Sequence, residues 1–243
     1  MVYIATHNCR GAFAAGDGGP SLPGMVITIA QQKGGAGKTT LAVHLALAWA
    51  ATNRRVSVID IDPQASLSTW FRLRRERLGS AAAIEAAAVT GWRVAAEVDR
   101  QAREHDIVLI DSPPHAETEA RLAARAATLV LVPVQPSPVD LWATKPTLDL
   151  ARAERVPALI VLNRVPPRAN LTETILAELK ALGAPVAAAR IGNRVAFAAA
   201  LAAGKGILEW SPASPAAAEI AALAEEVLSA AASASDPGRR YGA

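Results

Sequence analysis

The sequence predicts a doubly wound α/β domain with a mostly parallel sheet. About six apolar runs alternate with longer helical patterns, the order typical of strand-helix-strand units. A glycine-rich loop follows the first run, and aspartates end the next two. Polar groups are thereby expected at the carboxyl ends of parallel strands, where sites on open sheets gather. The 243 residues are enough for a single domain with a full core.

The elements follow from the apolar runs and the helical periodicity between them. The expected strands span 25–30, 55–62, 106–111, 128–134, 158–163 and 185–191. The expected helices begin at Leu41 and cover 65–78, 115–127, 171–182 and 216–232, with 81–105 as one or two alanine-rich helices.

The chain ends lack this periodicity. Residues 1–24 are rich in glycine and proline and predict a disordered N-terminal extension. The domain is expected at 25–232, with a flexible tail at 233–243. Because Met25 opens the first strand directly, Met1 and Met25 are both candidate starts, which the intact mass of the natively expressed protein would separate.

The composition narrows the class of protein. Hydrophobic residues make up 51% and aromatic residues only 4%, so alanine carries much of the apolar content. Charges and prolines keep every apolar segment below the ~18 residues of a spanning helix, so no membrane partner is expected. Cys9 is the single cysteine, which excludes an internal disulfide framework and suits a cytoplasmic protein. The net charge of +3 permits nucleic-acid binding without requiring it.

The glycine-rich loop at 31–40 predicts a phosphate site. Its glycines let successive N–H groups and the following helix N-terminus converge on an anion. Lys38 would reach the β- and γ-phosphates, and the Thr39 hydroxyl would bind Mg²⁺. The pattern is a variant, because Gln32 stands where the common motif has its first glycine and Lys33 adds a second lysine.

This loop resembles the deviant Walker A loop of the ParA/MinD family of ATPases. In that family the additional lysine, here Lys33, crosses a dimer interface to the partner subunit's nucleotide. The resemblance covers 25 to about 230 and implies a P-loop NTPase-like fold, ATP and Mg²⁺ as cofactors, and an ATP-dependent homodimer. It implies these nucleotide-binding residues: Lys33, Gly34, Gly35, Ala36, Gly37, Lys38, Thr39, Thr40, Pro136 and Asn163.

Three strand-end aspartates complete the predicted site. By the same resemblance, Asp62 activates the attacking water and is catalytic together with Lys33 and Lys38. Asp111 ends an apolar strand behind the phosphate loop, where its carboxylate can hold Mg²⁺ with Thr39. Asp60 and Asp62 are further metal candidates, although one of this pair could simply cap the helix that follows.

Two further features follow from the resemblance. The proline-rich stretch 133–138 resembles a loop that borders nucleotide and dimer interface in small plasmid-type ParA proteins, which places Pro136 at the nucleotide. Asn163 would contact adenine, with an ordinary turn asparagine as the alternative.

A basic stretch near the C-terminus is a candidate DNA surface. Arg190, Arg194 and Lys205 lie where no acidic residue occurs between positions 179 and 208. Unpaired cations of this kind bind phosphates without reading bases. The arginine run at 72–77 is more typical of a solvated helix face.

The sequence therefore predicts a slow ATPase that binds DNA nonspecifically as an ATP-bound dimer, associates with the nucleoid and segregates a plasmid or chromosome through a ParB-like or other adaptor. No helix-turn-helix domain is expected before the ATPase, which makes this the short ParA form. A protein cargo, such as a chemoreceptor cluster or microcompartment, and an ATP-binding scaffold with little turnover are the alternatives. A MinD-like membrane helix and an iron-sulfur enzyme are disfavoured, since the tail lacks an apolar face and Cys9 alone cannot hold a cluster.

Overall fold

A computed structural model of the protein describes residues 24–79, 84–114, 117–167 and 170–235. Within these residues, seven strands form one parallel sheet in the order β3-β2-β4-β1-β5-β6-β7. The strands are β1 (Met25–Ile29), β2 (Val56–Asp60), β3 (Glu85–Ala88), β4 (Ile107–Asp111), β5 (Leu129–Val134), β6 (Ala158–Val165) and β7 (Val186–Gly192). The predicted doubly wound α/β fold of P-loop NTPase type is confirmed.

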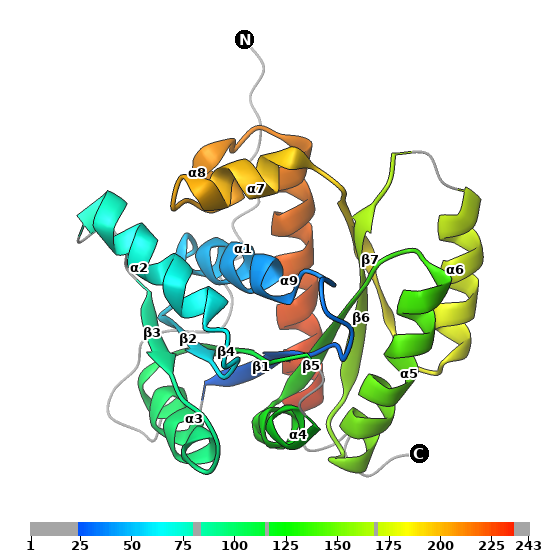
Figure 1. The fold of residues 1–243 in the computed structure, drawn as a ribbon, viewed down its shortest axis with the longest axis horizontal. Coiled ribbons are helices and arrows are strands. Elements are labelled where there is room, and N and C mark those ends of the chain that lie inside the picture. The colour runs from blue at the N-terminus through cyan, green and yellow to red at the C-terminus, as the bar shows by residue number, and fades with distance from the viewer. Residues whose placement is uncertain (1–23, 80–83, 115–116, 168–169, 236–243) are drawn as a thin grey trace.

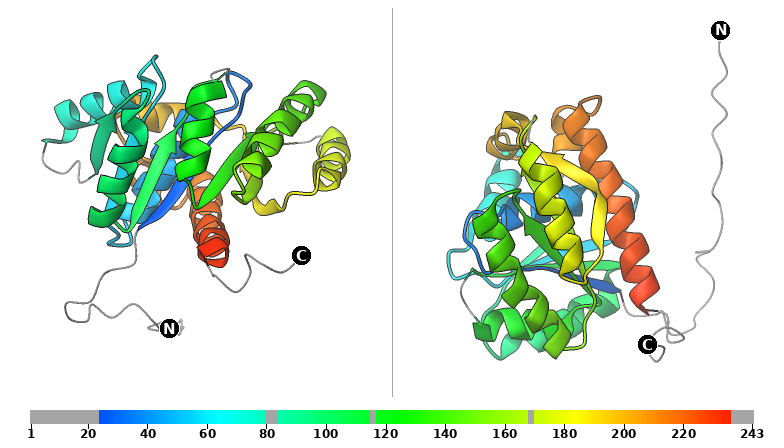
Figure 2. Two further views of the ribbon diagram at one scale, coloured as in Figure 1. Left: turned by 90° about the horizontal axis from the view of Figure 1, so that it is seen from below. Right: turned by 90° about the vertical axis from the view of Figure 1, so that its right-hand side faces the viewer.

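Helices cover both faces of the sheet (Figures 1 and 2). One face carries α1 (Lys38–Ala50), α2 (Ser66–Leu78), α7 (Val195–Ala202), α8 (Ile207–Trp210) and α9 (Pro215–Ser235). The other carries α3 (Arg93–Glu104), α4 (Glu117–Ala126), α5 (Pro138–Ala153) and α6 (Asn170–Ala181). None of the described helices is both long and apolar enough to cross a membrane.

The period of the strands explains this two-sided core. Ile27 and Ile29 of β1 pack with α1 and α9, whereas Val26, which precedes Ile27, packs on the opposite face with α3. Successive side chains of a strand point to opposite faces, so a strand buried on both sides is apolar throughout. The Trp49 indole of α1 also donates a 3.1 Å hydrogen bond to the Ala224 carbonyl of α9.

The sheet register positions the site. In the parallel pairs, Asp111 lies beside Ile29 of β1 on one side and beside Asp60 of β2 on the other. Both aspartates therefore reach the carboxyl edge of the sheet next to the loop that leaves β1. This arrangement follows from strand order and register, neither of which is encoded in any one segment.

One segment expected to be helical is a strand. Residues 81–105 were predicted as one or two helices, but Glu85–Ala88 pairs in parallel with β2 and forms the edge strand β3. Alanine favours helix locally, and the prediction was wrong because tertiary pairing overrides propensity. Glu85 is tied to Arg100 and Gln101 of α3, which holds this edge against the domain.

The predicted domain limits need two small corrections. Gly24, assigned to the extension, donates its N–H to the Ala102 carbonyl at 2.7 Å and so belongs to the folded domain. Helix α9 continues to Ser235, three residues into the expected tail. The rest of the predicted extension and tail, residues 1–23 and 236–243, lies outside the described residues.

A fully buried histidine in α1 makes stability depend on pH. His44 Nδ1 accepts the Ile207 N–H at 3.0 Å, so the proton of the neutral ring sits on Nε2. Burial lowers the pKa of His44 to about 4 from its ordinary 6.5. Its contribution to stability is therefore complete above about pH 6.5 and is lost as the pH falls toward 4, by about 3 kcal/mol.

We predict that His44→Asn removes this acid sensitivity. The asparagine carbonyl can still accept the Ile207 N–H, but it does not titrate. Urea unfolding at pH 7 and pH 5 should show a smaller loss of unfolding free energy for the variant than for wild type. The prediction fails if both lose the same amount over this pH interval.

Candidate functional site

The loop between β1 and α1 is held by its carbonyl groups. The Asn163 amide at the end of β6 donates to the Ala36 carbonyl at 2.7 Å, and the Gln135 amide donates to the Gly35 carbonyl at 2.9 Å. Within the described part of the chain, the N–H groups of residues 34–37 find no acceptor. The loop therefore presents free donors at the start of a helix, the arrangement that binds phosphates.

Two loop glycines adopt backbone angles that disfavour other residues. Gly35 has φ 79° and Gly37, the N-cap of α1, has φ 91°. A Cβ on Gly37 would lie 2.4 Å from Asn163 Nδ2, whereas a Cβ on Gly34 would meet nothing within 4 Å. Gly37 is thus needed both for its backbone angle and for space.

Lys38 points back into the loop. Its side chain is buried, and Nζ donates to the Gln31 carbonyl at 3.1 Å. Burial lowers the pKa of Lys38, while the charges of Asp111 and Asp62 raise it. A desolvated cation beside free N–H donors is suited to a phosphate group.

Thr39 and Asp111 form the candidate metal site. The Thr39 hydroxyl donates to Asp111 Oδ2 at 2.6 Å, and Asp111 Oδ1 is buried with no hydrogen-bond partner. Burial, aided by the charge of neighbouring Asp60 and opposed by the Thr39 hydrogen bond, raises the pKa of Asp111 to about 7. A buried carboxylate oxygen without a partner beside a hydroxyl fits Mg²⁺, which prefers oxygen ligands. These two residues would hold the ion.

Asp60 and Asp62 occupy different positions. Asp60 is buried, and Oδ2 accepts the Ser68 N–H and hydroxyl, each at 2.8 Å. Its carboxylate thereby anchors the first turn of α2, and its role in the metal shell stays a prediction. Asp62 is half-buried at the loop, and its charge acts on both Lys38 and Asp111. That position suits the predicted catalytic role, which stays a prediction.

Lys33 contacts α5 of its own chain. Its ammonium pairs with Asp140, a buried residue in the first turn of α5, which also accepts the Ser137 hydroxyl. Gln31 adds a 3.3 Å hydrogen bond to the Thr144 hydroxyl of the same helix. Helix α5 is therefore held against the start of the loop by contacts from Gln31 and Lys33.

The proline-rich stretch approaches the loop through Gln135. The structure gives no polar contact between Pro136, the predicted residue, and the loop, so its contact with nucleotide stays a prediction. Sequence reasoning did not single out Gln135 or Asp140. A buried aspartate near an unmatched lysine is not visible as a pair when the two lie 107 positions apart.

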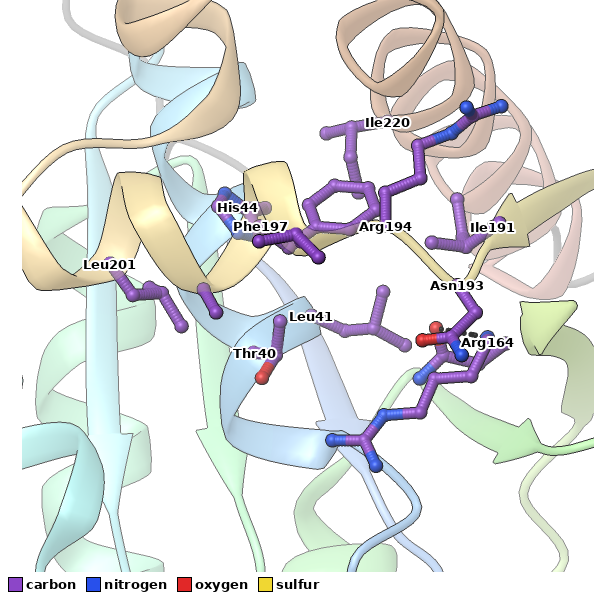
Figure 3. A pocket seen from close by; sticks show the side chains of 14 residues that line it. Thr40, Leu41, His44, Arg164, Ile191, Asn193, Arg194, Phe197, Leu201 and Ile220 are labelled. Carbon is purple, nitrogen blue, oxygen red and sulfur yellow. Dashed lines mark hydrogen bonds between the residues drawn. The ribbon is translucent and has the colours of Figure 1, made fainter. Parts of the chain in front are cut away.

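A pocket of about 330 Å³ adjoins the loop (Figure 3). It lies between the first turns of α1 and the segments that follow β6 and β7. Thr40 and Asn163, both predicted, line it with Arg164, Asn193 and Arg194, which were not predicted as nucleotide contacts. The pocket is mostly apolar with a few polar groups, the usual character of a site for an aromatic base.

Two of the three predicted DNA residues, Arg190 and Arg194, form ion pairs. Arg190 pairs with Glu173 of α6 at 2.6 Å, and Arg194 forms a two-nitrogen contact with Glu219 of α9. The expectation of free cations was wrong for both, because their acidic partners come from distant helices. Lys205 forms no ion pair within the described residues.

The CobQ/CobB/MinD/ParA nucleotide binding domain (CbiA) is the family whose model matches, over residues 27–207. The chain belongs to this family. The predicted ParA/MinD resemblance is thereby confirmed, and the matched region includes the glycine-rich loop.

Similar proteins include two with different cellular roles. The chain is 34% identical to "Maintenance of carboxysome distribution protein A" of Gloeobacter kilaueensis, covering 76% of this chain and 84% of that protein. It is 31% identical to the chromosome-partitioning ATPase Soj of Thermus thermophilus, covering 83% and 94%. The fold matches the septum site-determining protein MinD from Pyrococcus horikoshii, solved with Mg-ADP, at TM-score 0.70 and 20% identity, covering 87% and 99%.

We predict that Gly37→Ala and Gly34→Ala differ sharply. The Gly37 variant combines a strained backbone angle with a 2.4 Å approach to Asn163 Nδ2, so its unfolding free energy should fall by about 1–3 kcal/mol. Gly34→Ala should stay within about 0.5 kcal/mol of wild type. Chemical unfolding without nucleotide measures both, and equal stabilities would contradict the assignment.

Proposed function

We propose that this ParA/MinD family chain is a Mg²⁺-dependent ATPase that dimerises on binding ATP and positions a cargo inside the cell. The observation that carries the proposal is the cradle of free N–H groups at residues 34–37, which adjoins buried Lys38 and the Thr39 and Asp111 pair. Family membership supports it, because ParA and MinD relatives are P-loop ATPases.

Each group has a part in phosphoryl transfer. The loop N–H groups and Lys38 bind the β- and γ-phosphates and offset their charge. Asp62 orients the attacking water and takes its proton. Mg²⁺, when bound, neutralises charge that develops on the phosphate oxygens. Lys33 leaves Asp140 and reaches the γ-phosphate of the partner subunit, so hydrolysis waits for dimerisation.

The pocket beside the loop takes the nucleoside. We expect the base to lie near Asn163 and Asn193, which line this pocket together with Thr40. The Asn163 amide nitrogen donates to the Ala36 carbonyl, and its side-chain oxygen accepts the Arg164 N–H at 3.0 Å. The second lone pair of that oxygen is the group that can accept from the exocyclic amine of adenine.

The cargo is proposed to be a protein body. The more identical of the two relatives described above has carboxysome distribution as its role, and the other has chromosome partition. This favours a protein cargo over plasmid or chromosome segregation. The adaptor that links ATPase to cargo, the nucleoid association and the nonspecific DNA binding of the ATP-bound dimer are parts of the same proposal.

Asp62→Ala tests the catalytic assignment. Phosphate release should fall at least tenfold, since general-base groups contribute about 10²–10⁴-fold, while ATP binding remains. Asp99→Ala removes an exposed aspartate from α3 and is the matched control. Equal release by wild type and Asp62→Ala would defeat the assignment and favour a scaffold with little turnover.

A mixing experiment tests whether Lys33 acts across the dimer. Lys33→Ala and Asp62→Ala should each be inactive alone. Mixed one to one, they should recover about a quarter of wild-type hydrolysis, because half the dimers are mixed and each has one complete site. Action of Lys33 within its own subunit predicts no recovery at any ratio.

A further inference from the structure

Helix α2 exposes cations that have no acidic partner. Arg72, Arg75 and Arg77 are exposed, and none forms an ion pair within the described part of the chain. Arg72 and Arg75 are three residues apart and so share one side of the helix. Glu76, four residues after Arg72, is an exposed acid of the same helix. The three exposed arginines outnumber it, so the helix surface remains positive.

Lys205 lies next to this surface. Gly204, with φ 70°, carries the turn after α7 against α2, and a Cβ on it would lie 3.3 Å from Arg74 Cα and 3.5 Å from Arg77 Cδ. We call the exposed cations on and beside this helix, Arg72, Arg75, Arg77 and Lys205, the α2 basic face. Arg72 and Arg75 share one side of α2, whereas Arg77 and Lys205 flank it on the side that meets the turn after α7.

The α2 basic face is rigidly mounted. Buried Arg74 contacts both carboxylate oxygens of Glu209 at 2.8 Å, and the Trp70 indole donates to the Leu201 carbonyl at 2.9 Å. These contacts fix α2 on α7 and α8. They also pair Glu209, the acidic residue nearest in sequence to Lys205, with Arg74. With Glu209 paired, Glu76 is the exposed acid that remains on α2 beside Arg72, Arg75 and Arg77.

We propose that the α2 basic face binds the phosphate backbone of duplex DNA. Arg72 and Arg75 lie on one side of α2 and are separated by about 4.5 Å of helix rise, which is close to the ~3.4 Å rise between phosphates along one strand. The exposed large apolar residues all lie on other elements, and Leu73 and Leu78 of α2 are only half-exposed, so the face lacks the anchor a bilayer would require.

The inference rests on the proposed function and gives its DNA-binding step a location. It also relocates that step, since Arg190 and Arg194 are already paired with glutamates. Asp60 accepts the Ser68 N–H in the first turn of α2, and its neighbour in the sheet register is Asp111 of the candidate metal site. The Asp60 carboxylate therefore links the proposed nucleotide site to the helix that carries the proposed DNA surface.

DNA retention by two double variants tests the assignment. Arg72→Gln with Arg75→Gln removes two charges from the α2 basic face and keeps good helix formers. Arg54→Gln with Arg103→Gln removes two arginines that also form no ion pair in the described structure, near the amino ends of the strands. Phosphate release and thermal unfolding of both variants should match wild type.

With ATP, wild type should bind arbitrary duplex DNA, and the α2 variant should bind on the order of tenfold more weakly, with a salt slope shallower by about two. The control variant should bind like wild type. Equal binding by both variants overturns the location. Competition by polyglutamate as strong as by duplex DNA assigns the face to an acidic protein and overturns it too.

Wild type that hydrolyses ATP but does not bind DNA overturns the inference while the ATPase assignment stands. Wild type that neither hydrolyses ATP nor binds DNA overturns the proposed function itself. Both measurements are made on the same preparation, so the two failures are distinguishable.

Discussion

The site depends on the hydrogen bonds that the carbonyl groups of the phosphate loop accept. The Ala36 carbonyl accepts from Asn163 of β6, the Gly35 carbonyl from Gln135 after β5, and the Gln31 carbonyl from Lys38 of α1. A peptide whose carbonyl is fixed has its N–H fixed on the other side. The loop is thereby shaped before any anion arrives, which reduces the ordering that binding would otherwise require.

Asp60 and Asp111 are neighbours in the sheet register, but their carboxylates have different surroundings. Asp60 uses its oxygens on Ser68 and on the N–H of Asp62, so it stabilises backbone. Asp111 keeps one buried oxygen without a hydrogen-bond partner, an arrangement that costs free energy unless a cation or donor meets that oxygen. The oxygen without a partner belongs to Asp111, the residue suited to a cation. Asp60, whose oxygens accept hydrogen bonds, supports the loop that carries Asp62.

The sequence was informative where chemistry is local. Glycine spacing, the apolar strand before it and the strand-end aspartates predicted the loop, the parallel sheet and the pairing of Thr39 with Asp111. It failed where a feature depends on a distant partner. The alanines of β3 gain strand structure from β2, and Arg194 appeared free because Glu219 lies 25 positions away. Pairing between distant helices leaves no periodic signal in a single sequence.

Lys33 shows why the fastening of α5 matters to the proposed switch. In the proposed switch the Lys33 ammonium leaves Asp140 for the partner subunit's phosphate, so dimerisation separates the pair. Asp140 already has one buried oxygen without a partner, and loss of Lys33 leaves its charge less compensated. The γ-phosphate offers more charge than one carboxylate. An exchange of this kind favours the dimer only when the nucleotide supplies that anion, which is the condition an ATP-dependent switch must meet.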